Sequence, residues 1–129
     1  MAQGAMDLVA AAKAQVENLG VEEVAKEIEG GAVVLVDLRE PAEREANGTI
    51  PGAIHVPRGM LEFHADASTP YHIEALDPSK RVILHCAAGG RSALAAQTLQ
   101  QLGYTNVAHL DGGIKAWAEA GRSVEQPSA

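Results

Sequence analysis

Continuous apolar runs alternate with amphipathic stretches along this chain. The runs at 32–36 and 82–84 are rich in Val, Ile and Leu and show no polar alternation, which predicts strands covered on both faces. Shorter segments at 52–57 and 107–110 predict two more strands. Strands that alternate with helices favour an α/β domain with a parallel sheet. In such sheets, ligands bind beyond the carboxyl ends of the strands.

Apolar positions at helical spacing predict the helices between these strands. We expect an Ala-rich helix within residues 1–20 that ends at Gly20, and further helices over 21–28, from Pro41 to about residue 46, over 91–102, and after Gly112-Gly113. Residues 58–80 are the least regular part, with one helical turn around Leu61. The predicted organisation is an N-terminal helical extension over 1–20, one domain over 21–121 and a flexible tail over 122–129.

Composition and charge narrow the function. Seventeen acidic residues against ten basic ones give a formal net charge of -7, which disfavours nucleic acid as a partner. The apolar stretch at 8–12 is too short to span a membrane. A single cysteine excludes both an internal disulfide and a four-cysteine metal site, and the five histidines match no compact metal pattern. We therefore expect a cytoplasmic protein with no metal, no cofactor and no membrane partner.

The one cysteine, Cys86, directly follows the predicted strand at 82–84 and opens a loop of small residues before the next helix. In such a strand-loop-helix unit the backbone N–H groups converge on one point, and the helix N-terminus adds positive potential. This environment favours the thiolate, the form that a nucleophile requires. The opposing interpretation is a buried strand end followed by an ordinary turn. We predict Cys86 as the nucleophile, and an anion-binding loop made of Ala87, Ala88, Gly89, Gly90, Arg91 and Ser92.

Four stretches of the chain together resemble the rhodanese family of sulfurtransferases, in order and spacing, across about residues 20–121. They are the loop from His85 to Ser92, Val36-Asp37-Leu38-Arg39-Glu40, the segment from Ile50 to Pro57, and the segment from Leu110 to Trp117. The chain departs from the family at Gly48-Thr49-Ile50, where a histidine is frequent in the central position.

The resemblance implies a fold and a reaction. The fold would be a twisted five-stranded parallel sheet flanked by helices on both faces. In the reaction, the Cys86 thiolate would take a sulfane sulfur from a donor such as thiosulfate, become a persulfide, and pass the outer sulfur to cyanide or a thiol. The amides of residues 87–92 would hold the persulfide, and Arg91 would orient the loop or the donor. The implied partners are a small-molecule donor and acceptor, with a sulfur-relay protein as a further candidate.

Loop length distinguishes this reaction from that of a phosphatase. Cysteine-dependent phosphatases are similar but place five residues between the cysteine and the arginine, whereas four separate Cys86 from Arg91. The smaller loop suits one sulfur atom better than a tetrahedral oxyanion, which argues against a phosphatase or an arsenate reductase. Ala87 and Ala88 add no positive charge, so we expect no strong preference for thiosulfate over a persulfide donor. The main alternative is a non-catalytic binding or redox-sensing module.

The remaining polar and aromatic candidates receive structural roles. We predict an ion pair between Asp37 and Arg39 at the end of a buried strand. Asp111 is expected to cap the final helix, and Trp117 to anchor the core. No general base is required if the loop itself keeps Cys86 ionised.

Overall fold

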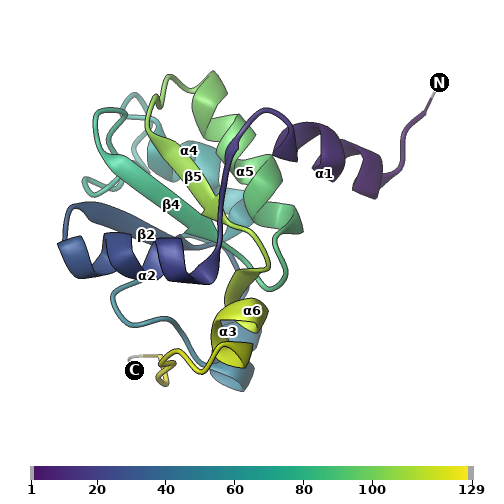
Figure 1. Ribbon diagram of the computed structural model, residues 1–129. Coiled ribbons are helices and arrows are strands. Elements are labelled where there is room, and N and C mark those ends of the chain that lie inside the picture. The colour runs from purple at the N-terminus through teal and green to yellow at the C-terminus, as the bar shows by residue number, and fades with distance from the viewer. Residues whose placement is uncertain (1, 128–129) are drawn as a thin grey trace.

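The alternating strand and helix patterns fold into one five-stranded sheet in which every neighbouring pair of strands runs parallel (Figure 1). The computed structural model describes residues 2–127. The strand order is β1-β5-β4-β2-β3. The strands are β1 (Glu17–Leu19), β2 (Val33–Asp37), β3 (Ile54–His55), β4 (Arg81–His85) and β5 (Val107–Leu110). The helices are α1 (Ala5–Lys13), α2 (Val21–Gly30), α3 (Pro41–Asn47), the 3-10 turn η1 (Arg58–Met60), α4 (Leu61–Ala65), α5 (Gly90–Gln101) and α6 (Gly113–Glu119).

Helices cover both faces of the sheet, because successive strand residues point to opposite faces. Val36, Val82 and Leu84 pack on the face covered by α4 and α5. Leu35 and Ile83 pack on the other face, with α2 and α6. In Figure 1, α2 crosses in front of the sheet and α4 lies behind it. The predicted α/β fold with a five-stranded parallel sheet is therefore confirmed, and so is the burial of its central strands on both sides.

The carboxyl ends of the central strands meet at one edge of the sheet. Asp37, the last residue of β2, lies in register with His85, the last residue of β4. The Leu38 amide then donates to the His85 carbonyl at 2.9 Å. Cys86 comes next along the chain, so the candidate nucleophile lies at the edge where parallel sheets place their ligands.

The N-terminal segment differs from the prediction. Helix α1 ends at Lys13, and residues 17–19, which the sequence analysis assigns to a helix, form strand β1 along β5. Only Leu19 of this strand is apolar, so no run or alternation predicts it. The strand forms because the free edge of β5 offers hydrogen bonds, and because the Asn18 amide closes the preceding turn on the carbonyls of Lys13 and Val16.

The C-terminal segment returns toward the body of the molecule after α6. Glu125 forms an antiparallel bridge with Thr49, with amide-to-carbonyl distances of 2.7 and 2.8 Å. Residue 1 of the predicted extension and residues 128–129 of the predicted tail lie outside the described residues. Within residues 2–127, no helix has the length and apolar character needed to cross a membrane.

Candidate active site at Cys86

Strand β4 and helix α5 hold Cys86 between them, with the loop 86–89 as the connection. Gly89 turns the chain with a φ of 108°, a conformation that L side chains rarely adopt. Gly90 then begins α5, which runs for 12 residues away from the sulfur. The thiol therefore lies at the positive end of a helix, as the sequence pattern predicts.

Polar groups of the loop surround the sulfur, although Cys86 is only 1% exposed. The Gly89 amide donates to Sγ at 3.1 Å, and the Ser92 Oγ lies 3.6 Å from Sγ. Burial by itself raises the pKa of the thiol. The Ser92 hydroxyl and the backbone amides of Ser92, Gly89 and Ala88 act in the opposite direction and outweigh it, so the pKa is lowered overall.

The residues predicted for the anion-binding loop have three different roles. Ala88, Gly89 and Ser92 contribute the hydrogen bonds that lower the pKa of Cys86. Ala87 instead uses its carbonyl to accept from the Lys115 amide at 3.1 Å, which fastens the loop to α6. The remaining two, Gly90 and Arg91, form the first turn of α5.

Arg91 is held by Glu43 of α3. Two guanidinium nitrogens donate to the two carboxylate oxygens of Glu43, both at 2.8 Å. This paired geometry lowers the pKa of Glu43 to about 2. The Cys86 thiolate also helps to raise the pKa of Arg91, after the larger effect of Glu43, so the guanidinium lies within reach of the sulfur's field. The sequence analysis does not identify Glu43, because nothing in the charged stretch 39–45 distinguishes it from its acidic neighbours.

The start of α6 presses against the loop, backbone to backbone. The Ile114 amide donates to the Cys86 carbonyl at 3.0 Å. A Cβ at Gly113 would lie 2.3 Å from the Ala87 carbonyl oxygen, so this approach requires glycine. The prediction that Asp111 caps this helix is wrong. Its carboxylate binds Lys13 of α1 at 2.9 Å, and Gly112 is the N-cap residue, without a side-chain cap.

A buried ionic cluster lies beside the end of β4, next to the loop. The predicted pair of Asp37 and Arg39 is confirmed, with contacts of 3.0 and 2.9 Å between fully buried side chains. Arg44 adds a contact to the same carboxylate at 3.1 Å, which the sequence analysis does not predict. His85 lies beside the cluster, with its Nε2 3.9 Å from Asp37. Burial lowers the pKa of His85 despite the nearby Asp37 carboxylate, so this histidine is neutral at neutral pH.

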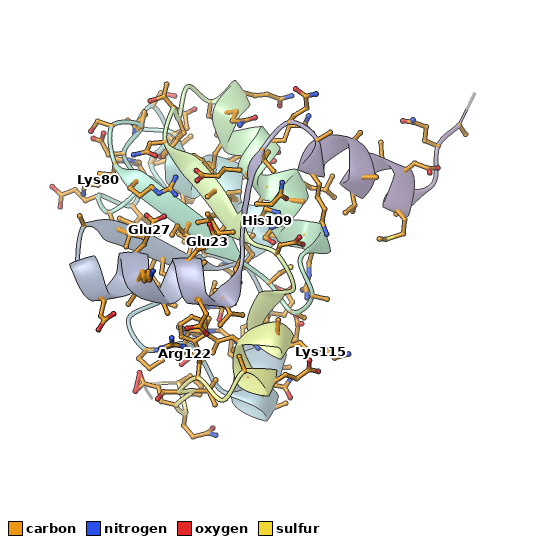
Figure 2. The ribbon with its side chains drawn as sticks, in the orientation of Figure 1. Glu23, Glu27, Lys80, His109, Lys115 and Arg122 are labelled. Carbon is orange, nitrogen blue, oxygen red and sulfur yellow. The ribbon has the colours of Figure 1, made fainter. Side chains whose placement is uncertain are left out.

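A second buried histidine contacts the site through Ser92. His109 on β5, labelled in Figure 2, is fully buried, with its Nδ1 2.8 Å from the Ser92 Oγ. Its Nε2 lies 2.7 Å from the Asn18 Oδ1. The sequence analysis treats His109 only as one of five histidines that form no metal site, and it does not consider Asn18. Neither residue carries a sequence signal, because their positions depend on how β1 pairs with β5.

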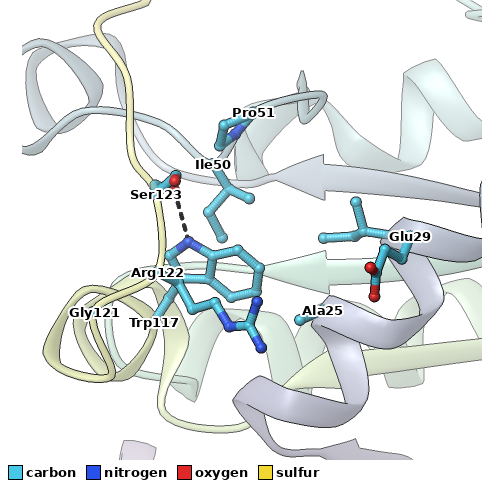
Figure 3. A pocket seen from close by; sticks show the side chains of 9 residues that line it. Ala25, Glu29, Ile50, Pro51, Trp117, Gly121, Arg122 and Ser123 are labelled. Carbon is cyan, nitrogen blue, oxygen red and sulfur yellow. Dashed lines mark hydrogen bonds between the residues drawn. The ribbon is translucent and has the colours of Figure 1, made fainter.

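Two pockets lie near the C-terminal helix. One of about 450 Å³ borders the loop at Ala87, with Arg39 and Lys115 among its lining residues. The other, of about 340 Å³, lies beside Trp117 and Arg122 and includes no residue of the loop (Figure 3). The predicted core role of Trp117 is confirmed, since its side chain is 5% exposed and donates to the Ser123 carbonyl at 2.9 Å. Within residues 2–127, no group of three or more His, Cys, Asp or Glu residues is placed to hold a metal ion.

Several known proteins are similar to this chain in sequence and in fold. A protein of Allochromatium vinosum named sulfurtransferase is 37% identical over 95 residues, which cover 74% of this chain and 80% of that protein. The solution structure of the polysulfide-sulfur transferase homodimer of Wolinella succinogenes superposes with a TM-score of 0.76 at 32% identity, over 95% of this chain and 87% of that one. A Rhodopseudomonas palustris protein of unknown function, described as a possible tyrosine phosphatase, gives a TM-score of 0.91 at 39% identity, over 97% and 96% of the two chains.

The family model of the rhodanese-like domain matches residues 20–120. This range contains β2 to β5 and the whole Cys86 loop. The chain belongs to the rhodanese-like domain family.

Proposed function

We propose that this protein is a sulfurtransferase that moves sulfane sulfur from thiosulfate or a persulfide donor to cyanide or a thiol acceptor. The observation that carries the proposal is the convergence of the Gly89 amide and the Ser92 side chain on the Cys86 sulfur, at the start of α5. Such an environment stabilises an anionic sulfur. The names of the Allochromatium and Wolinella relatives support the same chemistry.

The reaction divides into two displacements on sulfur. The Cys86 thiolate attacks the outer sulfur of the donor, a new S–S bond forms, and the donor's S–S bond breaks with its electron pair leaving on sulfite or on the donor thiolate. The acceptor then attacks the outer sulfur of the persulfide, and Cys86 leaves as the thiolate. The persulfide is itself an anion, so the amides that favour the thiolate also favour this intermediate.

Phosphatase chemistry fits the site less well, although one similar structure is described as a possible tyrosine phosphatase. A phosphatase needs an arginine whose paired N–H groups grip phosphate oxygens. Here both terminal guanidinium nitrogens of Arg91 donate to Glu43. The loop is also one residue shorter than the phosphatase loop.

One observation favours the alternative of a non-catalytic binding or redox-sensing module. With Cys86 1% exposed, a donor reaches the sulfur only if the loop moves. Two backbone hydrogen bonds, from Ile114 to Cys86 and from Lys115 to Ala87, hold the loop against α6 and oppose such a movement. The cytoplasmic location and a sulfur-relay protein partner stay predictions from the sequence.

Turnover assays separate these functions. We expect purified protein given thiosulfate and cyanide to form thiocyanate, and a small-molecule persulfide to serve at least as well as thiosulfate. Both activities should vanish in Cys86→Ser, with folding checked by circular dichroism. Hydrolysis of an aryl phosphate without any sulfur transfer would establish the phosphatase instead. A folded wild-type protein that turns over neither class of substrate would support the binding module.

A further inference from the structure

A continuous chain of side-chain contacts connects the Cys86 sulfur to the sheet edge. It runs from Cys86 Sγ to Ser92 Oγ at 3.6 Å, from Ser92 Oγ to His109 Nδ1 at 2.8 Å, and from His109 Nε2 to Asn18 Oδ1 at 2.7 Å. Cys86 is 1% exposed, and Ser92 and His109 are fully buried. The hydrogen-bond partners of these buried polar groups must therefore be other protein groups.

The direction of the hydrogen bond between His109 and Asn18 is fixed. The Asn18 Nδ2 already donates to the carbonyls of Lys13 and Val16, at 2.9 and 3.1 Å. The amide oxygen of Asn18 is therefore the atom that faces His109, and it can only accept. His109 must therefore carry a proton on Nε2 to donate to the Asn18 Oδ1, whether the ring is neutral or charged.

Two proton arrangements then satisfy the inner part of the chain. In the first, the thiol donates to Ser92, and the Ser92 hydroxyl donates to the neutral Nδ1 of His109. In the second, the His109 Nδ1–H donates to Ser92, and the Ser92 hydroxyl donates to the thiolate. A thiolate beside a neutral His109 satisfies fewer of these groups, because Ser92 has a single hydroxyl proton. If that proton goes to the sulfur, Nδ1 is left without a donor, and if it goes to Nδ1, the sulfur keeps only the loop amides.

We propose that Ser92 and His109 form a proton relay that takes the thiol proton of Cys86, so that the nucleophile forms as a thiolate–imidazolium pair. The inference rests on the proposed function and specifies how its nucleophile is generated. The S–H bond breaks with its electrons staying on sulfur, the proton passes to Ser92 Oγ, and the Ser92 proton passes to His109 Nδ1. His109 does not touch the sulfur and acts through Ser92.

The charges around His109 suit this role. Burial lowers the pKa of His109, which keeps the ring neutral when the sulfur is a thiol. Asp111, next to the end of β5, favours the imidazolium, whereas Lys13 of α1 opposes it. Those two groups are paired at 2.9 Å, so their effects on the ring largely cancel. The proposal therefore requires the Cys86 thiolate, on the other side of Ser92, to be the charge that stabilises a protonated His109.

The test measures both ends of the relay in the full chain. We expect nitrogen NMR to show His109 as an imidazolium at neutral pH in the wild type, while the ultraviolet absorbance of the thiolate is present. In Cys86→Ser the same ring should be neutral, with its proton on Nε2. A neutral His109 in wild-type protein whose thiolate absorbance is present would overturn the relay. This measurement uses the wild type alone and so does not depend on the folding of a variant.

Variants give a second, independent readout. In His109→Asn the side-chain oxygen can accept from Ser92 but cannot take the proton, so the thiolate pKa should rise by about one unit, a tenfold change in ionisation. Ser92→Ala should raise it similarly, and the double variant no further. His64→Asn, which changes a half-buried histidine on α4 outside the relay, is the matched control and should leave the pKa of the Cys86 thiol unchanged. An unchanged thiolate pKa in a folded His109→Asn would contradict the proposal.

Sulfur loading separates failure of the relay from failure of the proposed function. If wild-type Cys86 gains a sulfur atom but His109 stays neutral beside the thiolate, the relay is wrong and the sulfurtransferase proposal stands. If a folded wild-type protein shows the thiolate–imidazolium pair but accepts no sulfur from any donor, the function is wrong and the relay stands.

Discussion

At Cys86, burial and hydrogen bonding act on the same sulfur in opposite directions. Burial opposes ionisation, and the loop amides with the Ser92 hydroxyl favour it. The sequence predicts this balance because all the donors lie within six residues of the cysteine. It does not predict Glu43 or His109, which lie 48 positions from Arg91 and 17 positions from Ser92, because such pairs are set by tertiary structure.

Gly113 sets the distance between α6 and the loop, which gives a first prediction. Gly113→Ala combines a left-handed φ of 62° with a Cβ 2.3 Å from the Ala87 carbonyl oxygen. We expect a loss of about 2–5 kcal/mol in the free energy of unfolding, and slower sulfur transfer because the loop is displaced. Chemical denaturation and the thiocyanate assay measure the two effects.

Gly121→Ala is the matched control for Gly113→Ala. It has a similar φ of 80°, but its Cβ would meet nothing within 4 Å. We expect a loss of about 1–2 kcal/mol from the backbone alone, with normal activity. Equal losses in the two variants would show that α6 does not press on the loop.

Lys115 supplies positive charge beside the loop, on a pocket shared with Ala87. It points outward from α6 (Figure 2). We predict that Lys115→Glu lowers kcat/KM for thiosulfate, a dianion, by about three- to fivefold, because exposed charges interact by roughly 1 kcal/mol or less. Added salt should reduce the effect. The same change at exposed Lys26 on α2 should leave kcat/KM nearly unchanged, and equal effects at both positions would refute a local role for Lys115.

At the scale of elements, α1 supports α5 close to the site. Val9 and Ala12 of α1 pack against Ala93 and Leu94 of α5 in a small cluster of their own. We predict that Val9→Ala lowers the free energy of unfolding by about 1.5–2.5 kcal/mol, from lost apolar burial and the cavity that remains. Leu8→Ala, at a neighbouring residue that is 47% exposed, should cost less than about 0.5 kcal/mol. Denaturant titration of both variants tests this, and equal costs would mean that α1 does not pack as described.

The sequence predicts elements well where one pattern suffices. The apolar runs give β2, β4 and β5 within a residue or two, and Pro41 marks the start of α3. It fails at β1, because a three-residue edge strand with one apolar residue has no pattern of its own and depends on pairing with β5. The same pairing brings Asn18 to His109, so an error in one element also hides part of the candidate site.

For the whole molecule, the ion pair of Glu43 with Arg91 makes the free energy of unfolding depend on pH. Arg91 lowers the pKa of Glu43 in the folded protein from 4.5 to about 2. Because the pKa is lower in the folded state, ionised Glu43 stabilises the fold fully at a pH above its unfolded-state pKa. This contribution is lost as the pH falls from about 4.5 toward about 2. Glu43→Gln should therefore make the melting temperature less sensitive to pH in this window. The side chain of Glu43 is partly exposed, so solvent screening keeps the effect modest.

Glu45→Gln provides the control for the pH experiment. Glu45 lies on the same helix and is exposed, and within residues 2–127 it forms no ion pair. The pH dependence of its melting temperature should match that of the wild type. If Glu43→Gln also follows the wild-type curve, the ion pair between α3 and α5 does not contribute to folding in solution.

Intact-mass analysis after brief treatment with thiosulfate or a small-molecule persulfide tests the central claim most directly. The account predicts that the chain gains the mass of one sulfur atom, that peptide mapping places it on Cys86, that cyanide removes it, and that Cys86→Ser never acquires it. A folded wild-type protein whose mass stays unchanged with every donor, or whose added sulfur maps to another residue, would contradict the claim that Cys86 carries the transferred sulfur.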